Sequence, residues 1–463
     1  MQRTRIMNEI NQILTAGSVD VIIEALKRKS VCVPSWDKLI KDYEPKEHEI
    51  VTDTVTRKNK VKTDGSVEKA SRIYLGLEKL LTRRMTEFTF AIPVKRVYHN
   101  IEDNETRQSI AKAIEAIYKY ARIDAENIRR GNAYYAACEI CTIWYAVEKP
   151  NSLYGFRSKF KLKCNTYSPM DGVSLYPLFD EREYTKKILD KEITYFETYT
   201  ANKHYKWKQE NNRSWEEVTN EPIVLMKIPA IYAYRDSAIY ADLSYIRKEI
   251  EYTLSRNSDV IAYNSAPILK VAGGMQGKED KGESRRVFRV ENGGDVSYVS
   301  WAQSIEALKY HVETLTNSFW SQSQMPDISF EKMKNLGNIG YDARQTLLTD
   351  AHLKVGDEAG NWLELLDRES SIVKAFLSLM NVQWKEEIDN VDVENIITPF
   401  IQNDEKNEIE KLTTANGGKP ILSQLESIKA LGYSNDPEAT LKQIQEEEAV
   451  AEESKGSINV SAF

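Results

Sequence analysis

Long runs of helical periodicity dominate the second half of the chain, and they constrain its fold more than any other feature. Between residues 341 and 384, apolar side chains recur every three or four positions, which predicts one helix of roughly 60 Å. Just before it, residues 325–340 read MPDISFEKMKNLGNIG, and their proline and glycines predict a loop between two helical segments. Gly356 and Gly360 lie in the middle of the long helix, where we expect a bend.

Two more helices and a short β-rich insert precede this loop. One apolar stripe runs along residues 236–262, and a second runs along residues 301–322. The stripes consist of Ile239, Leu243, Ile246, Ile250, Leu254 and Ile261, and of Ile305, Leu308, Val312, Leu315 and Phe319. Residues 263–300 combine strand-like runs with a glycine-rich polar turn. The sequence therefore predicts a helix that leaves, a small β module, and a helix that returns.

Residues 1–235 mix helical and strand-like patterns, which predicts an α+β domain. The expected helices are Val19–Arg28 and Ile110–Tyr120, and the expected strands are Tyr134–Val147, Lys159–Lys163 and Ile223–Ile228. A polar hairpin is expected over Val51–Val67, with Asp64 and Gly65 at its turn.

Three short helices are expected after the long one, at Asp404–Thr414, Leu422–Leu431 and Asp436–Glu447. The last of them should begin with Asp436 as its N-cap and Pro437 at its first helical position. Residues 449–463 lack a packing face, so we expect a disordered tail.

Composition narrows the class of protein. The 463 residues can bury a substantial core and hold more than one domain. The longest apolar run, Ala133–Val147, is interrupted by Glu139 and falls short of the roughly 20 residues of a membrane span. The first residues lack the apolar core of a secretory signal, and four cysteines indicate a reducing compartment, so we expect a cytoplasmic site of synthesis and assembly. A net charge of -7 argues against a tight, sequence-independent nucleic-acid binder, but not against a surface that DNA passes.

Motifs that could carry chemistry are better explained as structure. Cys138 and Cys141 form a C-x-x-C pair, but they lie inside an apolar run without further ligands at metal-site spacing, so a buried strand is favoured. The turn at 273–279 has three residues between its glycines and no Ser or Thr after its lysine, so it is a loop tip and not a P-loop. The helices within 422–447 are too acidic for a DNA-binding helix-turn-helix. We therefore expect no metal, no cofactor and no enzyme; chemistry at the two cysteines is the weakest alternative.

The order of these elements resembles the portal proteins of tailed bacteriophages, in the branch typical of siphophages with Gram-positive hosts. The resemblance covers about Ile223 to Glu448, and three groups of residues carry it. They are Gln324 to Phe330 with Gly337, Asn338, Ile339 and Gly340; Ile228 and Pro229 with Asp236, Tyr240, Asp242, Leu243 and Ser255; and Asn395–Phe400 with Gly417–Glu448. The chain departs from the family pattern at Ile339, where a serine is usual, and in its shorter β insert.

This resemblance implies a division into named parts. They are a wing (1–235), a first stem helix (236–262), a clip (263–300), a second stem helix (301–322), a tunnel loop (323–340), a long wing helix with its return (341–394), a crown (395–448) and the tail (449–463). In such portals about twelve copies form a ring with a central channel. By resemblance the channel residues of the tunnel loop are Met325, Pro326, Lys332, Lys334, Asn335, Gly337, Asn338 and Gly340, and the clip contacts its partner through Lys278, Lys281, Arg285 and Arg286.

The resemblance also implies a function. The ring would occupy one unique vertex of the virion capsid after assembly in the host cytoplasm, and double-stranded DNA would be packaged and ejected through it. The implied partners are other copies of the chain, the large terminase that drives packaging, the major capsid or scaffold protein and a head–tail adaptor, without a membrane. The alternative is a structural head–tail adaptor, or another oligomeric scaffold, that has no DNA channel.

Overall fold

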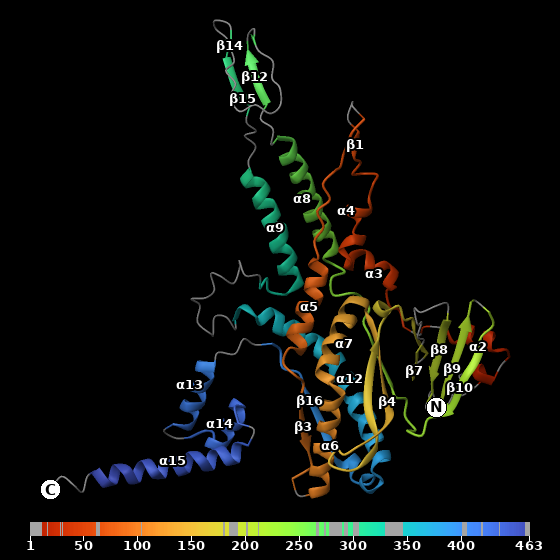
Figure 1. Cartoon of the computed structure of the whole chain (residues 1–463), viewed down its shortest axis with the longest axis vertical. Helices are drawn as coiled ribbons and strands as arrows, with labels where there is room; N and C mark the ends of the chain where they lie inside the picture. The colour runs from red at the N-terminus through yellow and green to blue at the C-terminus, as the bar shows by residue number, and fades with distance from the viewer. Residues whose placement is uncertain are drawn as a thin grey trace. The chain divides into compact units, whose positions relative to one another are not determined.

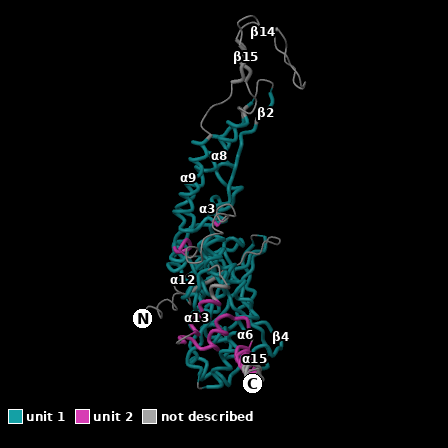
Figure 2. Tube along the Cα trace, turned by 90° about the vertical axis from the view of Figure 1, so that its left-hand side faces the viewer, with its two compact units in different colours: residues 1–327, 350–400 teal, residues 328–349, 401–463 magenta. Residues whose placement is uncertain are grey.

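A computed structural model gives the structure of the chain. It describes residues 12–15, 17–27, 29, 31–61, 65–102, 104–178, 181–184, 193–200, 202–211, 213–264, 268–272, 275–276, 289–290, 295–299, 305–328, 346–400, 405–417, 420–434 and 436–458. The chain divides into two compact units (Figure 2). Unit 1 comprises Met1–Asp327 and Asp350–Phe400, and unit 2 comprises Ile328–Thr349 and Ile401–Phe463.

An antiparallel three-stranded sheet with helices beside it forms the core of unit 1 (Figure 1). Its strands lie in the order β11 (Ala230–Tyr234), β4 (Glu139–Asn151) and β5 (Ser158–Tyr167). The helices are α5 (Leu77–Phe90), α6 (Glu105–Ala121), α7 (Ile123–Ala137) and α12 (Thr349–Met380). Trp362 of α12 packs edge-on against Phe90 and Tyr134, with ring centroids 4.8 Å and 4.9 Å away. These aromatic contacts bury α12 against two other helices of the unit.

Helices α5 and α7 approach each other closely at one glycine. A Cβ atom at Gly131 would lie 2.7 Å from the methyl group of Thr86 and 3.3 Å from the ring of Phe90. Only glycine allows this separation without movement of the neighbouring helix.

A second antiparallel sheet lies in the same unit and has the order β10-β9-β8-β7-β6. Its strands are β6 (Leu175–Leu178), β7 (Glu181–Tyr184), β8 (Ile193–Tyr199), β9 (Lys203–Glu210) and β10 (Glu216–Pro222). Helix α2 (Val19–Leu26) covers it with Ile22, Ile23 and Leu26, which pack against Phe196 and Trp207. This confirms the helix expected at Val19–Arg28, whose apolar residues lie on one face.

Other predictions for the first half are partly confirmed. The helix at Ile110–Tyr120 lies within α6, and the strand at Lys159–Lys163 lies within β5. The strand expected at Tyr134–Val147 is wrong at its start, because α7 continues to Ala137 and Cys138 follows in the left-handed region, with φ 65°. The last turn of a fully buried helix is apolar on every side, and so it has the composition of a buried strand.

The strand expected at Ile223–Ile228 is also wrong, because these residues form a turn between β10 and β11. Pro222 and Pro229 bracket this turn and have no N–H group for a ladder. A short strand pair that the sequence did not indicate joins β3 (Lys95–His99) to β16 (Asp392–Ile396). Two 3-10 turns, η4 (Val382–Trp384) and η5 (Ile388–Asn390), lie between α12 and β16.

The segment before α5 combines short helices with a hairpin. It contains α3 (Trp36–Tyr43), η1 (Pro45–Glu47), α4 (Glu49–Thr52) and a hairpin of β1 (Lys60–Val61) and β2 (Val67–Glu68). The hairpin predicted over Val51–Val67 is confirmed by the pairs Lys60–Glu68 and Val61–Val67, although its first residues form α4. Gly65 has φ +78°, as a tight turn requires, and Asp64 lies outside the described residues.

The helix, β module and returning helix predicted for the middle of the chain are present. They are α8 (Ser244–Asn264); β12 (Ile268–Ala272) paired with β15 (Asp295–Val299); β13 (Met275–Gln276) paired with β14 (Arg289–Val290); and α9 (Ile305–Ser323). Helix α8 begins eight residues later than expected, because residues 236–243 form turns. Ile239 and Tyr240 are held there by bonds from the Ile239 N–H to the Tyr135 carbonyl and from the Tyr240 hydroxyl to the Ala136 carbonyl.

The long helix is confirmed as α12, which runs without interruption through Gly356 and Gly360; the bend there stays a prediction. Unit 2 contains α13 (Glu405–Asn416), α14 (Gln424–Leu431) and α15 (Pro437–Ile458), at the three predicted places. The side chain of Asp436 caps α15 by accepting a 3.1 Å bond from the Ala439 N–H. The disordered tail is wrong for residues 449–458, which continue α15, since their alanines and glutamates favour helix without a packing face. Residues 459–463 lie outside the described residues.

Candidate functional site

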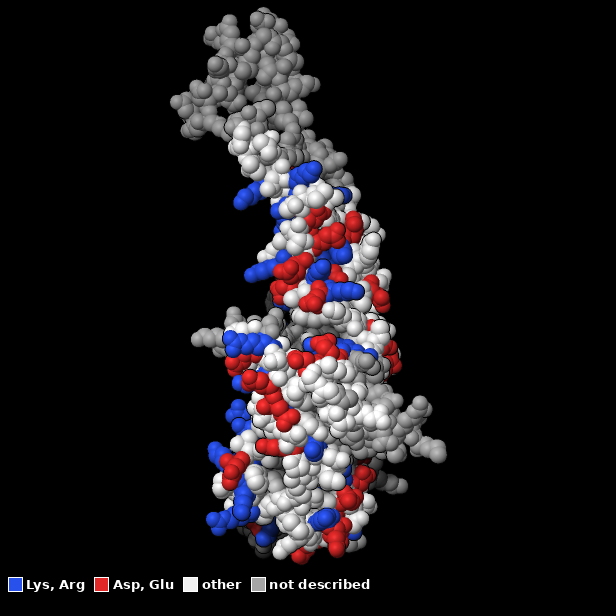
Figure 3. Space-filling model, turned by 90° about the vertical axis from the view of Figure 1, so that its right-hand side faces the viewer, with Lys and Arg blue, Asp and Glu red and all other residues white. Residues whose placement is uncertain are grey.

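Helices α8 and α9 form a two-helix stem in which each helix packs on one side (Figure 1). The predicted stripe of α9 is confirmed, because Phe319 is buried and Leu308, Val312 and Leu315 are half-buried, while the residues between them are mostly exposed. Acidic and basic side chains intermingle along the stem surface (Figure 3). The stem therefore leaves long charged helix faces open to solvent.

A buried polar row lies beside the predicted apolar stripe at the base of α8. Of that stripe, Ile239, Leu243 and Ile250 are buried and Ile246 and Leu254 are half-buried. Arg247 is fully buried and forms three ion pairs, with Glu78 at 2.7 Å, Glu251 at 2.8 Å and Asp42 at 2.8 Å. Burial opposes the charge of Arg247, but the facing carboxylates outweigh it and raise the pKa of the guanidinium. The predicted apolar stripe is wrong only at its end, because Ile261 is 61% exposed.

His48 completes this ionic cluster. Its Nδ1 lies 2.7 Å from the Glu251 carboxylate, and its Nε2 lies 2.9 Å from the carbonyl oxygen of Asp42. Both partners are hydrogen-bond acceptors, so the fully buried ring can donate to either of them. Burial raises the pKa of Glu78 in spite of Arg247 beside it. The cluster thus joins α8 to α3, η1 and α5 through charges that are costly to separate.

An extended segment, residues 69–76, lies along the same face of α8 and is called the strap below. The N–H groups of Ser71, Ile73 and Leu75 donate to Asp259, Ser255 and Glu251 at 2.8, 2.9 and 2.8 Å. Alternate residues of an extended chain are about 6.7 Å apart, and every fourth helical residue rises about 6 Å. These similar repeats allow one face of α8 to bind three successive N–H groups of the strap.

The base of the stem is also fixed where α9 ends. Gln324 has a left-handed backbone with φ 55°, and Met325 is buried. The Lys354 ammonium of α12 donates to the carbonyl of Ser323 at 2.6 Å, and burial lowers the pKa of Lys354 to about 8. Pro326 follows half-buried, so the chain leaves α9 from a defined position.

Most of the site residues that the resemblance implies lie outside the described residues. Of the tunnel-loop residues, the structure describes Met325 and Pro326. The other predicted loop residues lie outside the described part; they are Lys332, Lys334, Asn335, Gly337, Asn338 and Gly340. The predicted clip residues also lie outside it; they are Lys278, Lys281, Arg285 and Arg286.

The described residues do not offer an enzyme site. Burial raises the pKa of the Cys138 thiol to about 12, so it stays protonated and unreactive. Cys141 lies buried on β4, as the strand interpretation predicted, whereas Cys138 lies at the junction before it. Within the described ranges no group of His, Cys, Asp and Glu is arranged to hold a metal ion. Among these same residues, no helix is long and apolar enough to cross a membrane.

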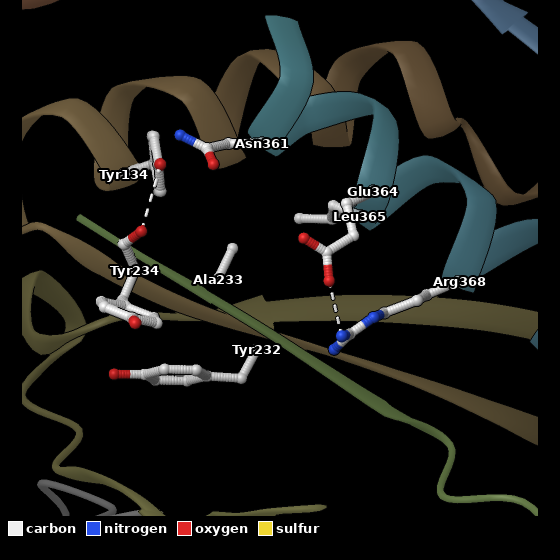
Figure 4. A pocket seen from close by; sticks show the side chains of 8 residues that line it. All are labelled: Tyr134, Tyr232, Ala233, Tyr234, Asn361, Glu364, Leu365 and Arg368. Atoms are coloured by element: carbon white, nitrogen blue, oxygen red, sulfur yellow. Dashed lines mark hydrogen bonds and ion pairs between the residues drawn. The ribbon is translucent and has the colours of Figure 1, made fainter. Parts of the chain in front are cut away.

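A small open pocket lies between α7, β11 and α12 (Figure 4). It is lined by Tyr134, Tyr232, Ala233, Tyr234, Asn361, Glu364, Leu365 and Arg368. Glu364 and Arg368 pair at 2.5 Å, and the Tyr134 hydroxyl donates to the carbonyl of Tyr234 at 3.2 Å. These groups are engaged with one another, and none of them forms a nucleophile–base pair.

Comparison with known families identifies the architecture. A family model described as phage portal protein, SPP1 Gp6-like, matches residues 28–454. The chain belongs to this portal family. This portal protein is thus a structural component of a phage particle and not an enzyme, and its α+β fold is that expected from the sequence.

Two further comparisons add less. No curated protein matches this portal protein. Among solved structures, a chain from the neck of an empty GTA particle computed with C6 symmetry is 10% identical, with a TM-score of 0.39. That match covers 85% of this portal protein and 95% of the neck chain.

The polar base of the stem is the feature that sequence reasoning missed. Its only signal in the sequence is the spacing of Arg247, Glu251, Ser255 and Asp259, four residues apart along one helix face. Such a row normally indicates a solvent-exposed face. The row is buried because the strap, which is far away in the sequence, lies against it and donates hydrogen bonds to it.

Proposed function

We propose that copies of this portal protein form a ring at one capsid vertex, with their stems around a channel for double-stranded DNA. Membership of the portal family supports this role, and the stem carries the proposal for this chain. A closed ring requires each subunit to present two different faces to its neighbours. Helices α8 and α9 supply them, because each packs against its own subunit on one side and is open on the other.

Exposed apolar side chains on the stem support such contacts. Tyr245 and Ile261 of α8 are 85% and 61% exposed, and Tyr310 of α9 is 72% exposed. Large apolar side chains on otherwise charged helices gain free energy when a neighbouring subunit covers them. We therefore place part of the subunit interface on the stem.

The oligomer is tested by native mass spectrometry and negative-stain microscopy of the full chain. We expect closed rings whose mass is a multiple of 53.2 kDa, with about twelve copies. Replacement of Tyr245 and Tyr310 by Glu should yield monomers, whereas Val218→Glu on the exposed strand β10 should leave the rings intact. Monomers of the unchanged chain, or rings that survive the two stem substitutions, would contradict the proposed interface.

We propose further that residues 323–340 line the narrowest part of the channel. Support comes from the fixed exit of α9, where buried Met325 and the Lys354 bond direct the chain before the loop. Lys332 and Lys334 are the proposed contacts to DNA phosphates. Transient contacts of this kind suit a channel, because a strongly basic wall would retain DNA.

The loop is tested in packaged particles. Lys332→Glu with Lys334→Glu should leave ring assembly unchanged and lower the DNA content of each particle. Lys38→Glu with Lys41→Glu, on the surface helix α3, makes the same change of charge and serves as the control. Unchanged DNA content in the loop variant, with rings present, would refute the phosphate contacts of Lys332 and Lys334.

Partner docking is assigned to the clip. Its basic residues Lys278, Lys281, Arg285 and Arg286 are proposed to meet the large terminase during packaging and the head–tail adaptor afterwards, while the wing meets the major capsid or scaffold protein. Glutamate at these four positions should abolish co-purification with terminase and adaptor and leave rings intact. Retained co-purification would refute the assignment.

A further inference from the structure

One face of the β4–β5 hairpin carries a regular row of cations that the proposed function does not use. Lys159, Lys161 and Lys163 alternate along β5, and Arg157 directly precedes the strand. These four residues are called the basic row. Arg157, Lys159 and Lys163 are exposed, and Lys161 is half-buried. On the opposite face of β5, Leu162, Cys164 and Thr166 are buried. The row therefore points away from the core.

The hairpin is strongly basic compared with the rest of the chain. Residues 144–165 contain five cations, the basic row and Lys149, against one carboxylate, Glu148. The local formal charge is therefore +4, while the whole chain carries -7. Among the described residues, no carboxylate forms an ion pair with any member of the row. The ammonium group of Lys161 instead lies over the ring of Tyr120, 5.9 Å from its centroid.

Protection of a sheet edge does not account for these lysines. Lysine often blocks an edge strand from pairing with other chains, and β5 is an edge strand. Two of the N–H groups that it turns away from β4 are, however, already bonded to side chains. The Thr166 N–H donates to Glu126 at 2.7 Å, and the Leu162 N–H donates to the Tyr154 hydroxyl at 3.0 Å. Part of the edge is thus closed without the basic row, so protection of the edge does not by itself explain the row.

The spacing of the row points to a polyanion with a regular repeat. Alternate residues of a strand lie about 6.7 Å apart. Phosphates of one DNA strand rise about 3.4 Å each and, because the strand winds about the helix axis, follow one another at about 7 Å. A rigid strand with a cation at every second residue thus matches successive phosphates over a short distance.

The surroundings of the row favour nucleic acid over an acidic protein. On β4, Tyr145 pairs with Lys163 and Val147 pairs with Lys161. Both apolar side chains are half-buried, so little apolar surface is exposed beside the cations. A protein interface normally needs a well-packed apolar or aromatic centre, and this face offers no pocket for one among the described residues. Tyr120, 39% exposed beside the Lys161 ammonium, provides a single ring here and not a series of platforms for base stacking.

We propose that the basic row binds the phosphate backbone of double-stranded DNA, without sequence preference and outside the tunnel loop. Non-specific binding of this kind has a Kd of roughly 10⁻⁴–10⁻⁶ M at physiological salt. Four neutralised phosphates give a slope of about -3.6 for log K against log salt. The wing would thus hold DNA weakly and release it readily.

The experiment measures fluorescence anisotropy of a fluorescein-labelled DNA duplex with the full-length protein over a range of KCl concentrations. Lys159→Gln with Lys163→Gln should weaken binding roughly 10- to 100-fold near 0.1 M salt and reduce the slope by about 1.8. Lys203→Gln with Lys208→Gln on β9 removes the same charge from another strand and should have no such effect. Both variants change side chains that are not buried, and equal unfolding temperatures would confirm that they fold.

Two outcomes would overturn the proposal. In the first, the β5 variant binds the duplex like the unchanged protein and the β9 control. In the second, the β5 variant loses affinity for poly-glutamate while its DNA binding is unchanged, so an acidic protein is the ligand. Repeating the titration with Lys332→Glu and Lys334→Glu separates the row from the tunnel loop. The titration requires no ring, so failure of this inference is distinguishable from failure of the proposed assembly.

Discussion

Replacing Glu369 by Gln tests the central ion pair of unit 1. Glu369 of α12 is buried and accepts bonds from two nitrogens of Arg130 at 2.5 and 3.3 Å and from the Trp144 indole at 2.9 Å. These bonds join α12 to α7 and β4. Glutamine keeps the shape and can still accept from the indole, but it leaves the buried guanidinium of Arg130 without a counter-charge.

The expected loss is about 3–5 kcal/mol in the free energy of unfolding, the usual cost of removing one partner from a buried ion pair. The matched control is Glu364→Gln, one turn earlier in α12. Glu364 and Arg368 are 62% and 43% exposed, and such surface pairs contribute about 0–1 kcal/mol. The difference between the two variants isolates burial, because the substitution and the helix are the same.

Urea unfolding followed by tryptophan emission measures both variants, and Trp144 reports directly on the site. Protein concentration must be held constant, since assembly stabilises the folded chain by mass action. A loss at Glu369 below about 1 kcal/mol, equal to that of the control, would refute the view that this pair locks α12 onto the sheet.

Three further predictions concern other parts of unit 1. Burial raises the pKa of Glu197, but His204 at 3.6 Å and Lys206 at 2.9 Å outweigh it and lower the pKa to about 2. The stabilisation from Glu197 is therefore fully present above pH 4.5 and is lost as pH falls toward 2, on the order of 3 kcal/mol in all. In Glu197→Gln this part of the acid dependence of unfolding should disappear, and an unchanged profile would contradict the assignment. Gly131→Ala should destabilise by about 1–3 kcal/mol because its methyl group meets Thr86, whereas Gly356→Ala, with open space around it, should stabilise by up to about 1 kcal/mol. Thermal unfolding of the pair decides this, and equal effects would show that the close approach of α5 and α7 is unimportant. Of the four thiols, exposed Cys32 alone should react rapidly with Ellman's reagent in the native protein; a second rapid thiol would show that the buried cysteines are accessible.

The sequence predicted those elements whose buried face or start is determined by the element's own residues. In α9 the apolar residues from Leu308 to Phe319 recur at helical spacing, and that stripe is half-buried to buried while most residues between are exposed. Asp436 and Pro437 are adjacent residues with known preferences at a helix start, and α15 begins there. No distant partner was needed for either prediction.

Elements that depend on distant partners could not be predicted in this way. Strands β3 and β16 are five residues each, are rich in charged side chains and pair across almost 300 residues of sequence. Arg247 and Glu251 of α8 would be exposed on an isolated helix and become buried only because the strap and α3 cover them. The candidate site was therefore predicted in its outline, two helices and a β module, while the chemistry of its base was not.

The strap also limits how α8 can move along the segment that precedes α5. If α8 slid by one turn, so that each strap N–H met the side chain four positions earlier, Leu75 would face Arg247 instead of Glu251. A donor would then oppose a donor, and the bond would be lost. A slide in the other direction would carry Ser71 beyond Asp259, the last acceptor of the series. The three bonds therefore fix one register of α8 against the strap, and a shift by one turn in either direction loses at least one of them.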